Sequence, residues 1–284
     1  MSSLFGPLDD VAGDAGHVEH PPRVGFFTDT SVCIGCKACE VACKQWNGVP
    51  AAEHLDLLGM SHDNTGALGA NAWRHVAFVE QSKPVDLGMP AVDGLRWLMA
   101  SDVCKHCTHA GCLDVCPTGA LFRTEFGSVV VQQDICNGCG YCVSACPFGV
   151  IDRRADDGRA WKCTLCYDRL GDGRTPACAQ ACPTESIQFG ELDELRARAR
   201  RRVAQLHERG MPEAYLYGAD AAGQPGTDGL NAFFLLVDRP EVYNLPPDPV
   251  VPRKKLGPAW ASMAAAGLAL AGAVVGSVLS GGRR

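Results

Sequence analysis

The stretch Cys136-Asn-Gly-Cys139-Gly-Tyr-Cys142-Val-Ser-Ala-Cys146-Pro147 decides the fold of this 284-residue chain. It places three thiols within seven residues and a fourth after three further residues. Three thiols spaced in this way can converge on three corners of one small cube if the backbone curls into a tight turn. Gly138 and Gly140 permit that curl, in which backbone N–H groups face the sulfurs. The spacing therefore predicts a polynuclear metal site rather than an ordinary loop.

The same arrangement occurs four times and uses all 16 cysteines. In every set a Cys-x2-Cys pair is followed by a Cys-x3-Cys segment. The first and third sets have the spacing just quoted, whereas the gap before the third cysteine is four residues in the second set and 11 in the fourth. In chain order the sets are Cys33, Cys36, Cys39 and Cys43; Cys104, Cys107, Cys112 and Cys116; Cys136, Cys139, Cys142 and Cys146; Cys163, Cys166, Cys178 and Cys182.

Two other uses of cysteine fit the spacing less well than a cluster does. Disulfide scaffolds are usually short and secreted, and the acidic N-terminus, with Asp9, Asp10 and Asp14, has no apolar segment typical of a secretory signal. Four-cysteine zinc sites separate two Cys-x2-Cys pairs by a dozen or more residues, which three thiols in a row do not match. Zinc stays an alternative, more for the stretched fourth set than for the first and third.

The first and third sets have the spacing with which bacterial ferredoxins bind [4Fe–4S] clusters. In two-cluster ferredoxins the fourth cysteine of each motif ligates the other cluster, so motifs work in pairs and four motifs predict four clusters. Between the second and third sets, an alternating stretch from Phe122 to Gln132 broken by Gly127 predicts a β-hairpin, as in a duplicated ferredoxin. These two sets form one module, and the first and fourth form the other by elimination.

Exchange of the fourth cysteine within each module predicts four ligand sets. For the module of the second and third motifs these are Cys104, Cys107, Cys112 and Cys146 around one cluster, and Cys136, Cys139, Cys142 and Cys116 around its neighbour. For the other module they are Cys33, Cys36, Cys39 and Cys182, and Cys163, Cys166, Cys178 and Cys43.

Several residues beside these cysteines invite a functional interpretation. Lys37, Lys105 and Lys162 are candidates for tuning cluster potentials through their charge, with simple solvation as the alternative. His106, inside Cys104-x2-Cys107, is interpreted as a surface residue rather than a ligand. We find no nucleophile–base signature, no phosphate-binding glycine loop and no haem-attachment motif, and therefore predict no catalytic residue. The net charge of -6 argues against a nucleic-acid partner.

The predicted fold class is α+β, with two duplicated ferredoxin-like modules binding four [4Fe–4S] clusters and a C-terminal transmembrane helix. Residues 187–190 read as a closing strand, and residues 191–209 as a helix that begins acidic and becomes basic. The basic run Arg196–Arg202 is a docking patch or a solvated helix face. The expected divisions are an N-terminal extension, 1–23; a four-cluster domain, 24–190, with an insertion over 44–103 that includes a loop at 62–71 and a strand at 73–80; a wrapping or docking segment, 191–255; and a membrane anchor, 256–284.

The tail contains 21 residues without a charge, from Ala259 to Leu279. As a helix they span about 31 Å, close to the roughly 30 Å hydrocarbon core of a bilayer. Their composition is only weakly apolar, but Trp260 suits a membrane interface and Gly272-x3-Gly276 permits close helix packing. We predict an anchor docked on a membrane subunit, with a buried soluble helix as the alternative. Basic residues flank both ends, so charge leaves the orientation open.

The motifs Cys33-Ile-Gly-Cys36-Lys-Ala-Cys39, Cys146-Pro-Phe148 and Lys162-Cys163-Thr-Leu-Cys166 resemble those of the iron–sulfur (beta) subunit of respiratory, membrane-bound formate dehydrogenases. The resemblance covers residues 24–284. It implies a non-catalytic subunit that carries electrons one at a time through four [4Fe–4S] clusters. The implied donor is a molybdenum- or tungsten-pterin catalytic subunit, and the implied acceptor is a membrane cytochrome b-type subunit that reduces quinone.

The resemblance also bears on location and on alternatives. It suggests a single-pass membrane protein exported in folded form with a twin-arginine-bearing catalytic subunit, its bulk outside the cytoplasm; related complexes also face inward. The equivalent subunits of dimethyl sulfoxide, thiosulfate, polysulfide or nitrate reductases and of membrane hydrogenases share the four-motif plan, and electrons can run the opposite way in them. A zinc-binding assembly module is the alternative of another class.

Overall fold

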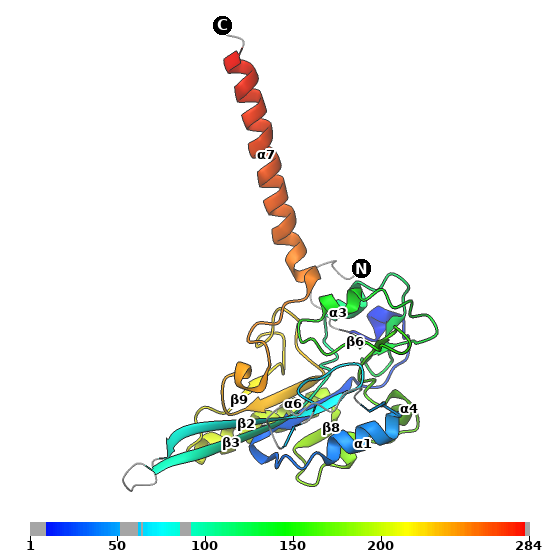
Figure 1. Ribbon diagram of the computed structural model, residues 1–284, viewed down its shortest axis with the longest axis vertical. Coiled ribbons are helices and arrows are strands. Elements are labelled where there is room, and N and C mark those ends of the chain that lie inside the picture. The colour runs from blue at the N-terminus through cyan, green and yellow to red at the C-terminus, as the bar shows by residue number, and fades with distance from the viewer. Residues whose placement is uncertain (1–9, 52–61, 64, 86–91, 282–284) are drawn as a thin grey trace.

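A four-stranded sheet joins distant parts of the chain in the computed structural model, which describes residues 10–51, 62–63, 65–85 and 92–281 (Figure 1). The strand order is β8-β1-β10-β9. β1 pairs antiparallel with β8 and parallel with β10, and β9 pairs antiparallel with β10. These strands are β1, Val24–Asp29; β8, Ile187–Glu191; β9, Tyr215–Tyr217; and β10, Ala232–Leu236.

The predicted closing strand at 187–190 is confirmed as β8. The segment 191–255, expected to wrap or dock, also supplies β9 and β10 to this sheet. β10 reads Ala-Phe-Phe-Leu-Leu and is buried along its whole length, because it lies between two other strands with both faces covered. Its pairing partner β1 is more than 200 residues away in sequence, so the two ends of the globular part are held together by backbone hydrogen bonds.

The predicted helix after β8 is confirmed as α6, Leu192–Glu208. Leu192, Leu195, Ala199 and Leu206 lie on one buried face, which packs against the sheet. Four arginines of the run 196–202 contact other groups of this chain. Arg196 contacts Asp193 and the Ala219 carbonyl, and Arg198 contacts Gln188. Arg200 pairs with Asp220, and Arg202 contacts Asp29 and Ser31. The run is thus largely engaged within the chain.

The insertion contains a long antiparallel hairpin of β2, Arg74–Val85, and β3, Val92–Val103 (Figure 1). The strand expected at 73–80 is confirmed as the first part of β2, whereas its partner β3 was not predicted. One end of the hairpin, where Arg74 pairs with Val103, lies against α1, Ala38–Asn47, and the short helix η2, Thr30–Val32. The insertion therefore contributes residues close to the first cysteine motif.

The remaining elements are short, and several of them carry cysteine motifs. The predicted hairpin between the second and third motifs is confirmed: β4 pairs with β5, and Gly127 has a positive φ of 77° in the turn between them. These elements are η1, Gly13–Ala15; α2, Gly111–Asp114; β4, Leu121–Arg123; β5, Val129–Val131; α3, Tyr141–Ala145; β6, Asp152–Arg153; β7, Ala160–Trp161; α4, Tyr167–Gly171; α5, Ala177–Gln180; η3, Pro240–Tyr243; and η4, Pro252–Lys255.

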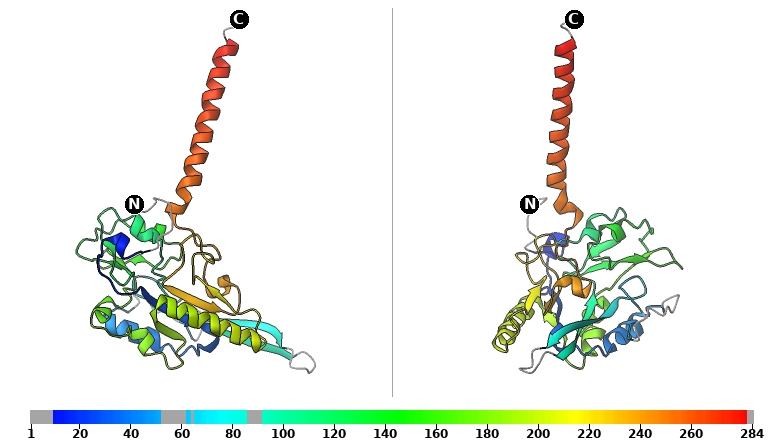
Figure 2. Two further views of the ribbon diagram at one scale, coloured as in Figure 1. Left: turned by 180° about the vertical axis from the view of Figure 1, so that it is seen from behind. Right: turned by 60° about the vertical axis from the view of Figure 1, so that its left-hand side comes forward.

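α7, Leu256–Gly281, projects from the globular part as a single long helix (Figures 1 and 2). Its side chains are exposed from residue 256 to residue 278, so it packs against no other described part of this chain there. Among the described residues it is the one helix long and apolar enough to cross a membrane.

Two ion pairs hold η4, which precedes α7, to the globular part. Arg253 pairs with Asp114 of α2, and Lys254 pairs with Asp228. Residues 1–9 and Arg283-Arg284 lie outside the described part.

Candidate metal centres

Four thiols from two different motifs line one cavity: those of Cys104, Cys107, Cys112 and Cys146. The first three lie on the loop that leads into α2 and on α2 itself, and Cys146 follows α3. We call this group the Cys104 site. The structure thus brings together the four thiols that the exchange of fourth cysteines predicts for one cluster.

A second cavity is lined by the thiols of Cys33, Cys36, Cys39 and Cys182, which we call the Cys33 site. Three of these cysteines come from the loop before α1 and its first turn, and Cys182 follows α5. The positive φ values of Gly35 (64°) and Lys37 (59°) curl this loop around the cavity. This group, too, is one of the four that the sequence predicts.

The remaining two groups are recognised by their mutual electrostatics. Burial raises the pKa of Cys163 well above its ordinary value, and the neighbouring thiols of Cys43, Cys104, Cys166 and Cys178 raise it further. Cys104 lines the cavity of the Cys104 site, and we call the other three with Cys163 the Cys163 site. Burial and then Cys136, Cys139 and Cys116 raise the pKa of Cys142 to about 11, and these four form the Cys136 site. Asn47 Nδ2 also contacts both Cys43 Sγ (3.7 Å) and Cys166 Sγ (3.8 Å), which ties α1 to the fourth motif.

The four sites form a row, because neighbouring thiols link each site to the next. Cys39 of the Cys33 site interacts electrostatically with Cys178 of the Cys163 site. Cys163 in turn interacts with Cys104, and Cys112 of the Cys104 site with Cys142 of the Cys136 site. The order is therefore Cys33 site, Cys163 site, Cys104 site, Cys136 site. The Cys136 site adjoins α3, near the start of α7, and the Cys33 site adjoins α1 at the far side of the globular part (Figure 1).

The thiol groups suit an iron–sulfur cluster more closely than a single ion. Within the described ranges, no three His, Cys, Asp or Glu side chains could hold one metal ion, whereas the thiols of the Cys33 and Cys104 sites surround cavities. Backbone N–H groups point at sulfur, as clusters require: Leu165 N lies 3.3 Å from Cys163 Sγ, and Ala160 N lies 3.4 Å from Cys136 Sγ.

Burial makes these thiols weak acids in the absence of metal. It raises the pKa of Cys43 to about 12 and that of Cys112 to about 12, beyond the opposing effect of nearby cations. Metal ligands must be deprotonated, so cluster insertion has to displace these protons. The protonated thiols of Cys43 and Cys112 are therefore poor nucleophiles until iron replaces the proton.

Buried cations compensate for the thiolates that a cluster would bring. Lys105 is 1% exposed, and its Nζ lies 2.5 Å from Asp102 Oδ1 and 2.8 Å from the Val103 carbonyl. Lys162 is 2% exposed and donates to the carbonyls of Val129 and Cys163. Solvation, the alternative considered for both lysines, is wrong, because neither ammonium reaches water. Lys37 is partly exposed and pairs with Glu40 (3.4 Å) and Asp63 (3.5 Å).

The interpretation of His106 as a surface residue is also wrong. It is 1% exposed and lines the cavity of the Cys104 site. Its Nδ1 accepts a hydrogen bond from Val129 N at 3.1 Å, and Nε2 has no partner among the described residues. Burial, and then the charges of Lys162 and Arg123, lower the pKa of His106 well below its ordinary value, so the ring is neutral. The ring is buried although it lies inside the second motif, because Val129 of the β4–β5 hairpin packs against it.

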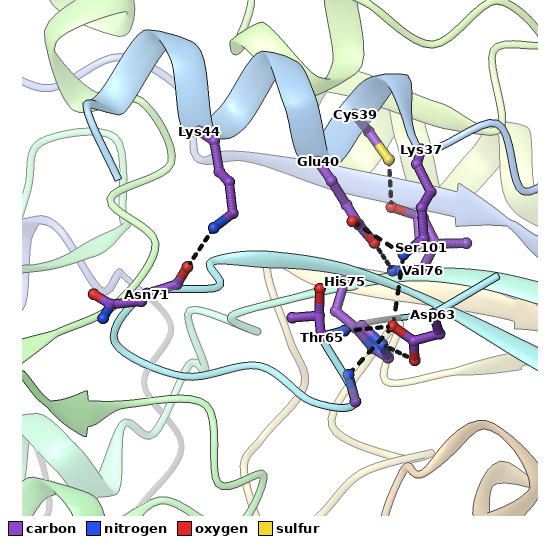
Figure 3. A network of polar contacts seen from close by, with 11 residues as sticks. Lys37, Cys39, Glu40, Lys44, Asp63, Thr65, Asn71, His75, Val76 and Ser101 are labelled. Atoms are coloured by element: carbon purple, nitrogen blue, oxygen red, sulfur yellow. Dashed lines mark hydrogen bonds and ion pairs between the residues drawn. The ribbon is translucent and has the colours of Figure 1, made fainter. Parts of the chain in front are cut away.

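Sequence reasoning missed the contribution of the insertion to the Cys33 site. Figure 3 shows Lys37, which precedes α1, and Glu40 of α1 facing His75 and Val76 of β2. Glu40 accepts a hydrogen bond from Val76 N (2.6 Å), and His75 Nε2 lies 2.8 Å from Asp63 Oδ2. Ser101 of β3 points at Cys39 in the same view. One signal was available in the sequence: Arg74 lies in phase with apolar Val76 and Phe78, so a charge occupies the inward face of a strand.

Comparison with known proteins agrees with this geometry. A 4Fe-4S dicluster domain model matches residues 32–120, and another model of that description matches residues 95–192. The formate dehydrogenase iron-sulfur subunit of Haemophilus influenzae is 40% identical over 237 residues, which cover 82% of this chain and 72% of that protein. The formate dehydrogenase-O iron-sulfur subunit of Escherichia coli is 38% identical over 256 residues, 87% of this chain and 79% of the other.

A more distant relative aligns over a shorter part of the chain. The B subunit of the anaerobic dimethyl sulfoxide reductase of Escherichia coli is 34% identical over 174 residues, 61% of this chain and 76% of that protein. Two dicluster domains and 16 cysteines fit four [4Fe–4S] clusters, and the relatives are electron-transfer rather than catalytic subunits. This protein belongs to the family of formate dehydrogenase iron–sulfur subunits.

Proposed function

We propose that the chain conducts electrons singly along the row of four sites, from a molybdenum- or tungsten-pterin formate dehydrogenase subunit to a membrane cytochrome b-type subunit that reduces quinone. The observation that carries this proposal is the order of the thiol groups. Each site neighbours the next in the row, and the last lies near the base of α7. A [4Fe–4S] cluster would supply one-electron chemistry. This chain would hold each cluster in place, shield it from water and set the charges around it.

The ligands we propose are the four thiols of each site. Cys33, Cys36, Cys39 and Cys182 hold the first cluster, and Cys163, Cys166, Cys178 and Cys43 the second. Cys104, Cys107, Cys112 and Cys146 hold the third, and Cys136, Cys139, Cys142 and Cys116 the fourth. The two thiol-lined cavities and the mutual pKa effects of the other thiols support this distribution.

The two ends of the row are accessible, as electron entry and exit require. Cys36 is exposed beside Ile34, whose side chain is 58% exposed, at the Cys33 site. Cys139 is exposed beside Tyr141, which is 60% exposed, at the Cys136 site. The middle sites have no exposed cysteine among their described ligands. Exposed apolar side chains next to a cluster ligand suit a protein interface, so we assign the Cys33 end to the catalytic subunit and the Cys136 end to the membrane subunit.

We assign α7 as a single-pass anchor that packs on helices of the membrane subunit. It is weakly apolar and rich in small residues, and Gly272 and Gly276 lie one turn apart on one face. The resemblance to exported respiratory complexes favours a globular part outside the cytoplasm. Deleting residues 256–284 should release the chain from the membrane fraction, and the anchor assignment fails if it does not. Protection of the globular part from protease in intact spheroplasts would refute the outward orientation.

Metal analysis of the anaerobically purified complex tests the cluster assignment. We expect about 16 iron and about 16 acid-labile sulfide per copy of this chain, beyond those of its partners, with broad absorption near ~400 nm. Stoichiometric zinc in place of iron would establish the alternative assembly module.

The 34% identity to a dimethyl sulfoxide reductase subunit supports a second candidate, a reductase subunit with electrons flowing outward from quinol. Formate-dependent reduction of all four clusters in the intact complex distinguishes the two.

A further inference from the structure

We propose that Arg74 is a charged bridge between the Cys33 and Cys163 sites that, with Ser101, raises the reduction potentials of both clusters together. The inference rests on the ligand sets proposed above. Arg74 begins β2 and is only 2% exposed. It lies outside every cysteine motif, on the insertion.

The contacts of Arg74 reach one cysteine of each site. Its Nη2 donates a hydrogen bond to Cys178 Sγ at 3.1 Å. Its Nη1 lies 3.3 Å from Ser101 Oγ, and that hydroxyl is 3.2 Å from Cys39 Sγ. Cys178 belongs to the Cys163 site and Cys39 to the Cys33 site. One guanidinium and one hydroxyl therefore connect the two ligand sets directly.

The charge on Arg74 needs a negative partner, because an isolated buried cation is very unfavourable. No Asp or Glu among the described residues forms an ion pair with it; the Phe26 ring, 4.9 Å from the guanidinium carbon, and the Ser101 carbonyl complete its surroundings. An arginine guanidinium is not deprotonated in proteins, so the buried group stays charged. The cluster thiolates are its counter-charge.

A fixed positive charge favours the more negative, reduced state of a nearby cluster, and hydrogen bonds to ligand sulfurs act in the same direction. Because Arg74 contacts both sites, its charge acts on two clusters at once. It also offsets the repulsion between two neighbouring anionic clusters when both carry an electron. The bridge consequently makes the first two positions of the row easier to fill from the donor.

Redox titration of the whole complex in membranes, followed by electron paramagnetic resonance of the four clusters, tests this role. Arg74→Gln should lower two of the four midpoint potentials and leave the other two unchanged. Ser101→Ala, which keeps the guanidinium but removes the hydroxyl beside Cys39, should lower one potential. Arg74→Lys, which keeps the charge, should hold both potentials above their Arg74→Gln values. Arg96→Gln is the matched control, since it removes a charge from the same hairpin at ion pairs with Asp238 and Glu213, and should change none.

The iron content distinguishes a wrong ligand assignment from a wrong role for Arg74. If the unmodified complex lacks the expected iron, the ligand assignment fails. If iron is complete in Arg74→Gln and all four potentials are unchanged, or all shift equally, the bridge is refuted while the ligand assignment stands. Should Arg74→Gln lose clusters, the smaller change Ser101→Ala decides: four unchanged potentials refute the bridge, and one lowered potential supports it.

Discussion

Cys146 lines the same cavity as Cys104, although the two residues belong to different motifs and Cys146 follows the helix that carries Cys142. A motif that ligated its own cluster with all four cysteines would have placed Cys146 beside Cys136. The short helix α3 instead carries the chain from one site to the next, and α2 does the same for Cys116. With the ligand sets proposed above, neither site of a module can form without a cysteine of the other motif.

Serine substitutions should reveal this exchange spectroscopically. We expect Cys146→Ser and Cys104→Ser to alter the same paramagnetic signal, and Cys116→Ser to alter the one changed by Cys136→Ser, because serine oxygen replaces sulfur at one corner of the shared cluster. Electron paramagnetic resonance of the reduced complex makes the comparison. A Cys146→Ser spectrum that matches Cys136→Ser would show that each motif is self-contained.

Removal of one partner from the buried pair of Lys105 and Asp102 should be strongly destabilising. Lys105→Met leaves the Asp102 carboxylate without its ammonium partner, 2.5 Å away in the native protein, and we expect a loss of about 3–5 kcal/mol. The midpoint denaturant concentration for loss of visible cluster absorption measures it. Lys105→Met with Asp102→Leu should recover most of the loss, since no unpaired charge remains. Equal losses in the single and double variants would contradict the ion-pair explanation.

Gly138 should be indispensable where a comparable glycine is not. A Cβ at Gly138 would meet the Gly158 carbonyl oxygen at 2.4 Å, and its φ is 72°. Gly149 has a similar φ of 63° but open space around it. Gly149→Ala should therefore cost only about 1–2 kcal/mol of backbone strain, whereas Gly138→Ala should displace the loop and lose the cluster at the Cys136 site. Iron content and the spectrum of that cluster report the difference; an iron-complete Gly138→Ala complex would show that the loop tolerates the side chain.

Alkaline pH should destabilise the sheet through Tyr215. Burial, followed by Tyr243, Glu241 and Asp238, raises the pKa of the Tyr215 hydroxyl to about 12. A group whose pKa is higher in the folded chain stabilises it fully below its unfolded pKa of about 10 and ceases to do so as pH rises to about 12. The thermal midpoint should thus fall across this window, and fall less in Tyr215→Phe, which also lacks the hydrogen bond to the Asp238 carbonyl. If the thermal midpoints of the two proteins fall in parallel as the pH rises, Tyr215 is not the group responsible.

The cysteine motifs show how far sequence reasoning reached. Spacing predicted the sets of thiols that the structure brings together, since three cysteines within one turn are constrained by the backbone alone. The hairpin of β4 and β5, the strand β8 and the helix α6 were predicted because turn residues and apolar periodicity are also local signals. The comparisons with known proteins confirmed the family that the motifs resemble.

Other features depend on segments that meet only in the folded chain. β10 was overlooked because its place beside β1 arises from pairing across more than 200 residues. His106 was interpreted as a surface residue, and solvation stayed an alternative for Lys105, because nothing in their own segments shows that a hairpin and Phe148 cover them. Burial is a property of what packs on a residue, which short-range patterns do not encode.

By itself, the sequence determined the number of thiols, their spacing and the chemistry they can support, because spacing along a tight turn is set by covalent geometry. Only the tertiary structure decided the order of the sites and the placing of charge between them. Arg74 and Ser101 reach Cys178 and Cys39 because the β2–β3 hairpin packs beside α1, which brings the insertion against both ligand sets. Charge acts through space, over distances that the fold alone establishes.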